Sequence, residues 1–224
     1  TRLLSMVVTH KALSKEERAI QSLIEQIAIA VTRAFEQAMD AFMEHDLDLA
    51  EKVIENDQYI NEICKQIEEQ SFFSIALRQP VANDLRKLLA SIHIAEEYER
   101  IGDYAADIAR KVHSMKEVPR KGCRDNFQLM TDLCKQMLDH ISEIHRSPDV
   151  QSAKNVAQMD NKVDDAEKVL VNSLIGQMRE YPETIENCIH AVSIAHKIER
   201  ISDRVTNIAE RIVFSTSGEV VELG

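Results

Sequence analysis

The chain has 224 residues, of which 44% are hydrophobic and 29% charged, and its 38 acidic and 27 basic residues give a net charge of −11. This composition excludes a disordered chain, the lack of any run of about 18 apolar residues excludes a transmembrane protein, and the negative charge argues against binding nucleic acid or anionic lipid. Five glycines and four prolines are about a third of average usage, so turns are few and we predict an all-α protein.

Six long helices are predicted from the places where the chain can turn. The first 79 residues contain no glycine or proline, and a break is predicted there at position 45, because Asp46 or Asp48 can cap a following helix. The other connections are marked by the prolines, which lack the amide hydrogen that a helix interior needs: Pro80, Pro119, Pro148 and Pro182. The predicted helices cover residues 15–45, 47–76, 82–115, 123–146, 149–180 and 183–215.

The six helices divide into two similar sets of three. Glu99-Arg100-Ile101-Gly102-Asp103 matches Glu199-Arg200-Ile201-Ser202-Asp203 at an offset of 100 residues. In the second helices of the two sets, an offset of 103 residues aligns Asp46, Val53 and Asp57 with Asp149, Val156 and Asp160. Matches in register indicate a duplication, and short connections make consecutive helices antiparallel. We therefore predict two tandem, pseudo-symmetric antiparallel three-helix bundles, at residues 1–118 and 119–224.

Oxygen-bearing side chains form a row on the third helix of each set. A helix turns about 100° per residue, so side chains four residues apart lie about 40° apart on its surface. The row lies on the side opposite the apolar heptad seam of each helix, and its members are Glu99, Asp103 and Asp107 in the first set and Glu199, Asp203 and Asn207 in the second. Each bundle is thus expected to present oxygen ligands away from its core.

The second helices add Asp57 and Asn61 in the first set and Asp160 and Asp164 in the other. Asp57 and Asp160 interrupt apolar faces, where an unpaired charge is costly, so each needs a partner. An arginine, a capping amide, water or a cation would serve.

Two interpretations of the acidic rows remain open. Carboxylates four residues apart repel each other, and clusters of oxygen ligands hold hard cations, iron or manganese; His93 with Glu96, and His196 with Glu199, could join such a site. Alternatively, the rows are solvated faces neutralised by nearby arginines: Arg100, Arg110, Arg200 and Arg204. No nucleotide-binding, hydrolase or metalloprotease motif occurs, and the Glu-x-x-His pairs of di-iron bundles are missing.

Three segments of the chain resemble the PhoU family over about residues 15–215. They are Arg78-Gln79-Pro80-Val81-Ala82-Asn83-Asp84-Leu85-Arg86 and the two Glu-Arg-Ile-x-Asp strings at 99–103 and 199–203. The resemblance implies two three-helix bundles and a negative regulator of phosphate uptake and of the phosphate-starvation response. Such a protein is an adaptor between the ATPase of the phosphate ABC transporter and a membrane sensor histidine kinase.

The resemblance also implies metal sites. PhoU proteins carry paired E(D)xxxD motifs that bind clusters of iron or other metals, and these motifs fall on Glu99 with Asp103 and on Glu199 with Asp203, with Asp57, Asp160 and Asp164 contributed by the adjacent helices. Iron is the first candidate, with zinc and manganese as alternatives. At two equivalent positions the sets differ: the first has Asn61 and Asp107 where the second has Asp164 and Asn207. The two sites therefore need not bind metal equally well. Along the third helix, the first site carries the larger negative charge.

Further expectations concern the setting of the protein. Its cysteines form no CxxC pair and are expected in the core of a protein from a reducing compartment: Cys64, Cys123, Cys134 and Cys188. With no convincing signal peptide, we expect a cytoplasmic homodimer that meets the membrane only through its partners. The alternative function is a metal-dependent helical-bundle enzyme, an oxidase or hydrolase.

Overall fold

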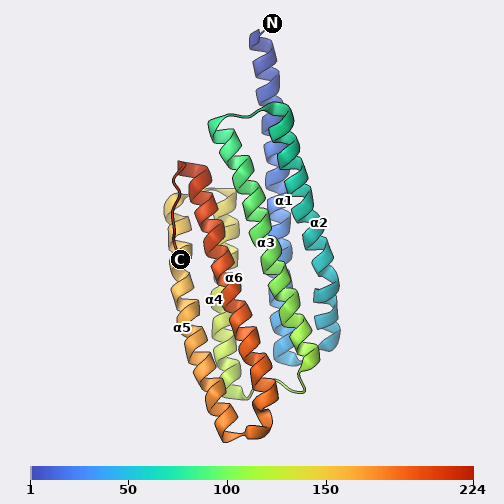
Figure 1. Cartoon of the computed structure of the whole chain (residues 1–224), viewed down its shortest axis with the longest axis vertical. Helices are drawn as coiled ribbons and strands as arrows, with labels where there is room; N and C mark the ends of the chain where they lie inside the picture. The colour runs from blue at the N-terminus through green and yellow to red at the C-terminus, as the bar shows by residue number, and fades with distance from the viewer. Residues whose placement is uncertain (1) are drawn as a thin grey trace.

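The computed structural model describes the backbone of residues 2–224 and the side chains of residues 13–120 and 122–224. Six long α-helices account for nearly all of this part of the chain, which contains no β-strand (Figure 1). Their bounds are α1 Arg2–Glu44, α2 Leu47–Arg78, α3 Ala82–Ser114, α4 Lys121–Arg146, α5 Val150–Glu180 and α6 Ile185–Ser217, with a 3₁₀ turn, η1, at Pro182–Thr184 before α6. The prediction of an all-α protein is confirmed.

The helix boundaries lie within two residues of the predicted ones except at the start of α1. Helix α1 begins at Arg2 instead of residue 15, in a stretch where no glycine or proline interrupts it. Lys121 and Gly122 belong to α4 and not to the connection before it. The helix predicted to start at residue 183 begins at Ile185, because Pro182 opens a 3₁₀ turn first.

The second helices of the two sets begin in the same way. The Asp46 carboxylate accepts a hydrogen bond from the amide of Leu49 at 2.9 Å, and the Asp149 carboxylate accepts one from the amide of Ser152 at 2.7 Å. Such N-caps satisfy amides that have no partner within the helix. Because both caps lie at equivalent positions, the side chains that follow on α2 and α5 are in register.

The helices form two layers. Helices α2, α3, α6 and α5 lie side by side in one layer, and α1 and α4 lie behind it (Figure 1). Helix α1 covers α2 and α3, helix α4 covers α5 and α6, and α1 and α4 also contact each other. The buried side chains form one continuous hydrophobic cluster through both sets, and the rings of Phe42 and Phe127 meet edge to face between α1 and α4 with centroids 4.7 Å apart.

Polar contacts between α3 and α6 join the two sets of helices. The contacts come in pairs: a residue of α3 contacts a residue of α6, and the residues at the equivalent positions make the reverse contact. The Nζ of Lys197 lies 2.6 Å from Oδ2 of Asp107, and the Nδ2 of Asn207 donates to Oε2 of Glu97 at 3.2 Å. Positions 97 and 197 therefore contact positions 207 and 107, as in an interface related by a two-fold axis. The two bundles are pseudo-symmetric about the α3–α6 contact.

The ends of the chain add two details. After α6, the last residues run back along the helix, where the amide of Leu223 donates to Oε1 of Glu210 at 2.8 Å. No helix in residues 2–224 is both long and apolar enough to traverse a lipid bilayer. The boundary predicted after residue 118 falls in the connection between α3 and α4.

Candidate functional site

The position of Asp103 on α3 organises the first candidate site. On the surface of α3, Glu99 lies about 40° and Gly102 about 100° from Asp103 in one direction. In the opposite direction, Asp107 lies about 40° and Tyr104 about 100° from Asp103. The side with Gly102 packs on α2, and the side with Tyr104 packs on α6, where Nζ of Lys197 lies 4.9 Å from the Tyr104 ring centre. The row predicted from the sequence is therefore divided between two neighbouring helices.

Asp57, Glu99 and Asp103 form the first acidic cluster, at the contact of α2 and α3. All three are half-buried, and Oδ1 of Asp57 is buried without a hydrogen-bond partner among the described residues. Burial raises the pKa of Asp57 and of Glu99, and the charge of Asp103 raises both further. The cluster thus holds carboxylates that oppose one another's ionisation.

Asp160, Asp164, Glu199 and Asp203 form the second acidic cluster, at the contact of α5 and α6. Asp160 is only 9% exposed. One oxygen each of Asp160, Asp164 and Glu199 is buried without a hydrogen-bond partner in the described part of the chain. Burial raises the pKa of Asp160, Glu199 and Asp203, and neighbouring carboxylates raise all three further, although the hydroxyl of Ser202 opposes the shift at Asp160.

A close helix contact positions Asp57 against α3. A Cβ added to Gly102 would lie 3.0 Å from two side-chain atoms of Ile60 and 3.6 Å from Oδ1 of Asp57. Position 202 of the second set carries serine, and the position equivalent to Ile60 carries the smaller Val163. Gly102 therefore permits a close contact between α2 and α3, and the second set combines its larger residue, Ser202, with a smaller one at the position equivalent to Ile60.

Asp107 and Asn207 do not join the two acidic clusters. Oδ2 of Asp107 lies 2.6 Å from Nζ of Lys197, and its Oδ1 accepts from Nη1 of Arg110 at 2.8 Å. Burial acts to raise the pKa of Asp107, but the hydrogen bonds and charges of Lys197 and Arg110 outweigh it and lower that pKa. Asn207 donates to Glu97.

The additional acid that the sequence places on the third helix of the first set is thus paired with Lys197 and Arg110, although its charge still raises the pKa of Asp57. Counting the remaining carboxylates, the second cluster is the more acidic of the two. Its additional charge comes from Asp164, which the first set replaces with Asn61.

The clusters do not form a ready-made coordination shell. Among the side chains described, no three of the His, Cys, Asp and Glu residues are grouped as they would be around a bound metal ion. The unpartnered carboxylate oxygens nevertheless suit a hard cation, which accepts oxygen ligands and would relieve their repulsion. Metal binding at these residues stays a prediction.

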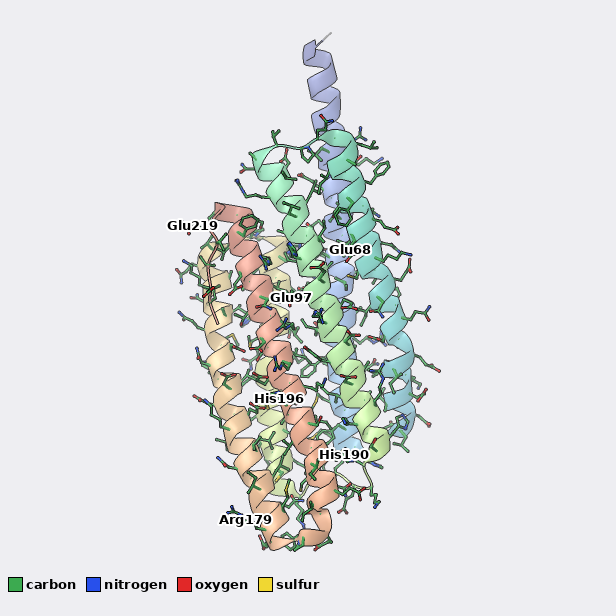
Figure 2. All side chains as sticks on the ribbon, viewed as in Figure 1. Glu68, Glu97, Arg179, His190, His196 and Glu219 are labelled. Carbon is green, nitrogen blue, oxygen red and sulfur yellow. The ribbon has the colours of Figure 1, made fainter. Side chains whose placement is uncertain are left out.

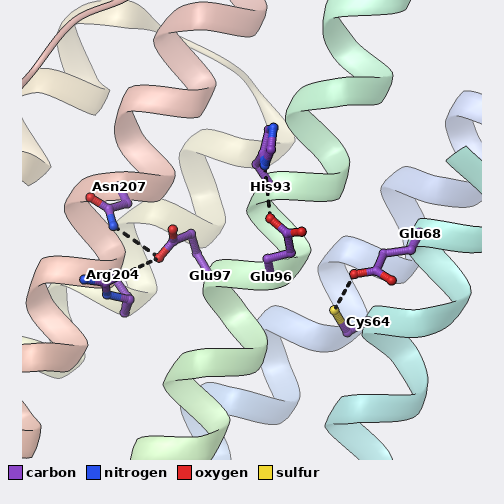
Figure 3. A network of polar contacts seen from close by, with 7 residues as sticks. All are labelled: Cys64, Glu68, His93, Glu96, Glu97, Arg204 and Asn207. Carbon is purple, nitrogen blue, oxygen red and sulfur yellow. Dashed lines mark hydrogen bonds and ion pairs between the residues drawn. The ribbon is translucent and has the colours of Figure 1, made fainter. Parts of the chain in front are cut away.

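The two His and Glu pairs named in the sequence analysis lie beside the clusters, and one of them has a further partner, Glu167. His196 Nδ1 lies 3.2 Å from Oε1 of Glu167 and 3.7 Å from Oε2 of Glu199. In the first set, His93 Nδ1 lies 3.0 Å from Oε2 of Glu96 (Figure 3). Both His and Glu pairs are in contact, and whether they join a metal site stays a prediction; Glu167 follows Asp160 by two turns on α5, a spacing from which it could have been found.

Cys64 is the counterpart of Glu167 at the 103-residue offset. Its Sγ lies 3.9 Å from Oε1 of Glu68 (Figure 3). Burial first, and then the charges of Glu68, Glu99 and Glu96, raise the pKa of the Cys64 thiol to about 12. The thiol therefore stays protonated at neutral pH in the metal-free protein. All four cysteines are free and buried, as expected for core residues.

Glu97 is the other residue that the sequence analysis missed. It lies at the α3–α6 contact, where its Oε2 accepts from Arg204 at 3.3 Å and from Asn207 at 3.2 Å (Figures 2 and 3). The sequence feature that could have indicated this contact is that Lys197, at the position equivalent to Glu97, has the opposite charge. That difference is informative only once α3 and α6 are known to be adjacent.

Both halves of the chain match one known protein domain. The model of the PhoU domain matches the chain twice, at residues 24–112 and 127–212. The phosphate-specific transport system accessory protein PhoU homolog of Rhizobium meliloti is 31% identical over 209 residues, which cover 92% of this chain and 88% of the relative. The homolog of the same name from Xylella fastidiosa (strain Temecula1) is 32% identical over 202 residues, 90% of this chain and 83% of the relative.

Solved structures are similar as well. The crystal structure of the phosphate transport system regulatory protein PhoU from Streptococcus pneumoniae superposes with a TM-score of 0.87 at 27% identity, covering 94% of this chain and 100% of that one. PhoU from Pseudomonas aeruginosa gives 0.87 at 28% identity, covering 92% and 99%. With its two matched domains, its six-helix architecture and its duplicated acidic clusters, the chain belongs to the PhoU family.

Proposed function

We propose that this protein is a negative regulator of phosphate uptake and of the phosphate-starvation response. It acts in the cytoplasm, as a homodimer, as an adaptor between the ATPase of the phosphate ABC transporter and the phosphate sensor histidine kinase. The observation that carries the proposal is the match of the PhoU domain to both halves of the chain, together with relatives named as accessory proteins of phosphate-specific transport. The proposal includes no catalysed reaction.

An adaptor needs surfaces that partner proteins can bind, and the end of α2 offers one. Four large apolar side chains are exposed there and at the start of the next connection: Phe72, Phe73, Leu77 and Val81. Isolated exposed apolar residues are common, but a group of them within one segment is typical of a protein interaction surface. We assign this segment to partner binding.

The acidic clusters are the second part of the proposal. We infer that Glu99, Asp103 and Asp57, and Glu199, Asp203, Asp160 and Asp164, bind transition-metal ions, with iron the first candidate and zinc and manganese the alternatives. Bound cations would neutralise the mutual repulsion of these carboxylates and link α2 to α3 and α5 to α6. The support is the set of buried carboxylate oxygens without hydrogen-bond partners in the described chain.

A deletion of the gene tests the regulatory role. In phosphate-rich medium the deletion strain should keep alkaline phosphatase at the level of starved cells, because the restraint on the kinase is lost. The wild-type gene should restore repression, and enzyme that stays low in the deletion strain would contradict the assignment.

Partner binding is tested in the same strain by recovery of the transporter ATPase or the kinase from membranes with the tagged protein. The variant Phe73→Asp should recover less of one of them, because it places a charge on a side chain that is 60% exposed. Val169→Asp on α5, at a side chain that is 57% exposed, is the matched control. Equal recovery by the two variants would remove the α2 segment from the proposal.

A further inference from the structure

A cavity of about 600 Å³ lies between the two bundles, away from the acidic clusters. It is formed by the sides of α1 and α3 together with the last turns of α4 and α6, near the end of the molecule at which α3 begins and α6 ends (Figure 1). Its size falls in the range of about 300–1,000 Å³ that is typical of small-molecule sites.

The cavity is basic although the chain as a whole is acidic. Arg18, Lys87 and Arg146 line it from three different helices. Glu17 is the only acidic side chain among its described lining residues. Arg18 and Arg146 form no ion pair within the described chain, and Lys87 reaches only Asp84, at 3.9 Å. In a chain with a net charge of −11, three cations from three helices and one carboxylate around the same cavity indicate a place for an anion.

His145, near the end of α4, supplies an independent observation. It lines the cavity, and both of its ring nitrogens are buried without a hydrogen-bond partner among the described residues. Burial lowers its pKa to about 4, so at neutral pH the ring carries one donor and one acceptor, and both are unused. Its backbone carbonyl accepts from Nε2 of Gln21 on α1 at 3.1 Å, which fixes its position.

Buried polar atoms without partners are costly, and proteins rarely retain them without a ligand, water or functional reason. The lining of the same cavity also has an apolar part, the buried side chains of Ile20, Leu88, Ile94 and Ile212. An inorganic ion has no apolar part that could contact these aliphatic side chains. The lining thus combines a cationic region, a neutral imidazole and an aliphatic surface.

We propose that this inter-bundle cavity binds a small organic phosphate, whose phosphoryl group lies among Arg18, Lys87 and Arg146 and accepts a hydrogen bond from His145. The terminal oxygens of a phosphoryl group point in three directions, which suits cations from α1, α3 and α4 better than the planar pair of a carboxylate. The uncharged body of the ligand contacts the aliphatic surface. The proposal does not depend on the metal sites or on partner binding.

The test is calorimetric titration of the full chain with three probes, one at a time: adenosine 5′-monophosphate, glycerol 3-phosphate and inorganic phosphate. Adenosine and glycerol control for the uncharged bodies, sulfate controls for charge alone, and citrate for a carboxylate anion. At least one organic phosphate should bind at least tenfold more tightly than inorganic phosphate, sulfate, citrate and its uncharged body. Failure of both organic phosphates to bind below about 1 mM, or equal binding of inorganic phosphate or citrate, would overturn the proposal.

Two variants localise the binding. Arg18→Gln and Arg146→Gln should each weaken the organic phosphate at least tenfold, whereas Arg179→Gln, an exposed arginine at the other end of the molecule (Figure 2), should leave it unchanged. All three changes remove one guanidinium from the surface, so folding is expected to survive and is checked by circular dichroism. Equal affinity in all three variants would place the ligand elsewhere.

Nuclear magnetic resonance of the histidine rings gives a second readout. Binding should shift the signals of His145 and raise its pKa, because the phosphoryl charge stabilises the protonated ring. Signals of His145 that stay unchanged at saturation would exclude this cavity, whatever the calorimetry shows.

Discussion

The two acidic clusters occupy equivalent places in the two bundles, yet they differ in charge and in packing. The α2–α3 cluster has Asn61 and faces Gly102, whereas the α5–α6 cluster has Asp164 and faces Ser202. Duplication therefore preserved the helix register while the chemistry of the two sites diverged.

The packing difference is compensated within each bundle. The larger Ile60 faces the smaller Gly102, and the smaller Val163 occupies the position equivalent to Ile60 in the bundle that has Ser202. The charge difference is not compensated, because the additional acid of the first set, Asp107, is bound by Lys197 and Arg110 at the α3–α6 contact. The two bundles thus differ in the net charge of their clusters, whereas at positions 60 and 102 the larger residue of one helix is matched by a smaller one on the other.

The largest expected effect comes from making the first bundle resemble the second at one position only. Gly102→Ser should lower the free energy of unfolding by about 1–2 kcal/mol, because the new Cβ would lie 3.0 Å from Ile60 and overpacking costs about 1–3 kcal/mol, partly offset by a better helix propensity. The double variant with Ile60→Val should recover part of the loss, because valine lacks the Cδ1 that makes one of the two 3.0 Å contacts and keeps the Cγ2 that makes the other. Urea unfolding followed by circular dichroism measures both.

Gly176→Ser is the matched control, because nothing lies within 4 Å of a Cβ added at this position of α5. It should be neutral or slightly stabilising. If Gly102→Ser behaved like this control, or if Ile60→Val failed to rescue it, the compensation between the two positions would be disproved.

The second prediction concerns the charge difference between the two acidic clusters, which two substitutions would exchange. Asp164→Asn should weaken metal binding at the second cluster about tenfold, and Asn61→Asp should strengthen it at the first by a similar factor, since each change alters one carboxylate ligand of a cation. Elemental analysis of protein purified without chelator or metal-affinity resin, followed by titration of the metal-free protein, measures both. The control is Asp165→Asn, which removes an exposed carboxylate of α5 that pairs with Lys168.

Less than about one transition-metal ion per chain in the wild-type protein, with no response to either exchange, would leave the acidic rows as half-buried faces without a ligand. If Asp165→Asn weakened binding as much as Asp164→Asn, general surface charge and not the cluster would account for the affinity.

The fold was accessible from the sequence because its determinants are local. Helix ends follow from prolines and from the caps at Asp46 and Asp149, and duplication follows from strings that repeat in register. The outward direction of Asp103 and Asp203 also follows from helical periodicity. Periodicity does not show which neighbouring helix Asp107 contacts. Asp107 lies about 40° from Asp103 on the surface of α3, and that position faces α6 only because the two bundles pack together. The cavity at His145 likewise depends on four helices from both halves.

The smallest effect concerns the repulsion inside the second cluster. In protein freed of metal by a chelator, Asp160→Asn should raise the free energy of unfolding at pH 7 by about 1 kcal/mol, or Tm by about 2–4 °C, because it removes a buried charge without changing the shape of the side chain. Thermal unfolding measures the difference between variant and wild type.

The pH dependence identifies the cause. Because the pKa of Asp160 is raised in the folded state, the native protein binds this proton more tightly than the unfolded chain does, and the wild type regains stability as pH falls. The advantage of Asp160→Asn should therefore be complete above the raised pKa, shrink as pH falls through it, and vanish below the ordinary value of about 3.9. The exposed control Asp165→Asn should show no such trend. An advantage that is constant with pH would mean that the amide improves packing or hydrogen bonding, and that repulsion among the carboxylates does not destabilise the metal-free protein.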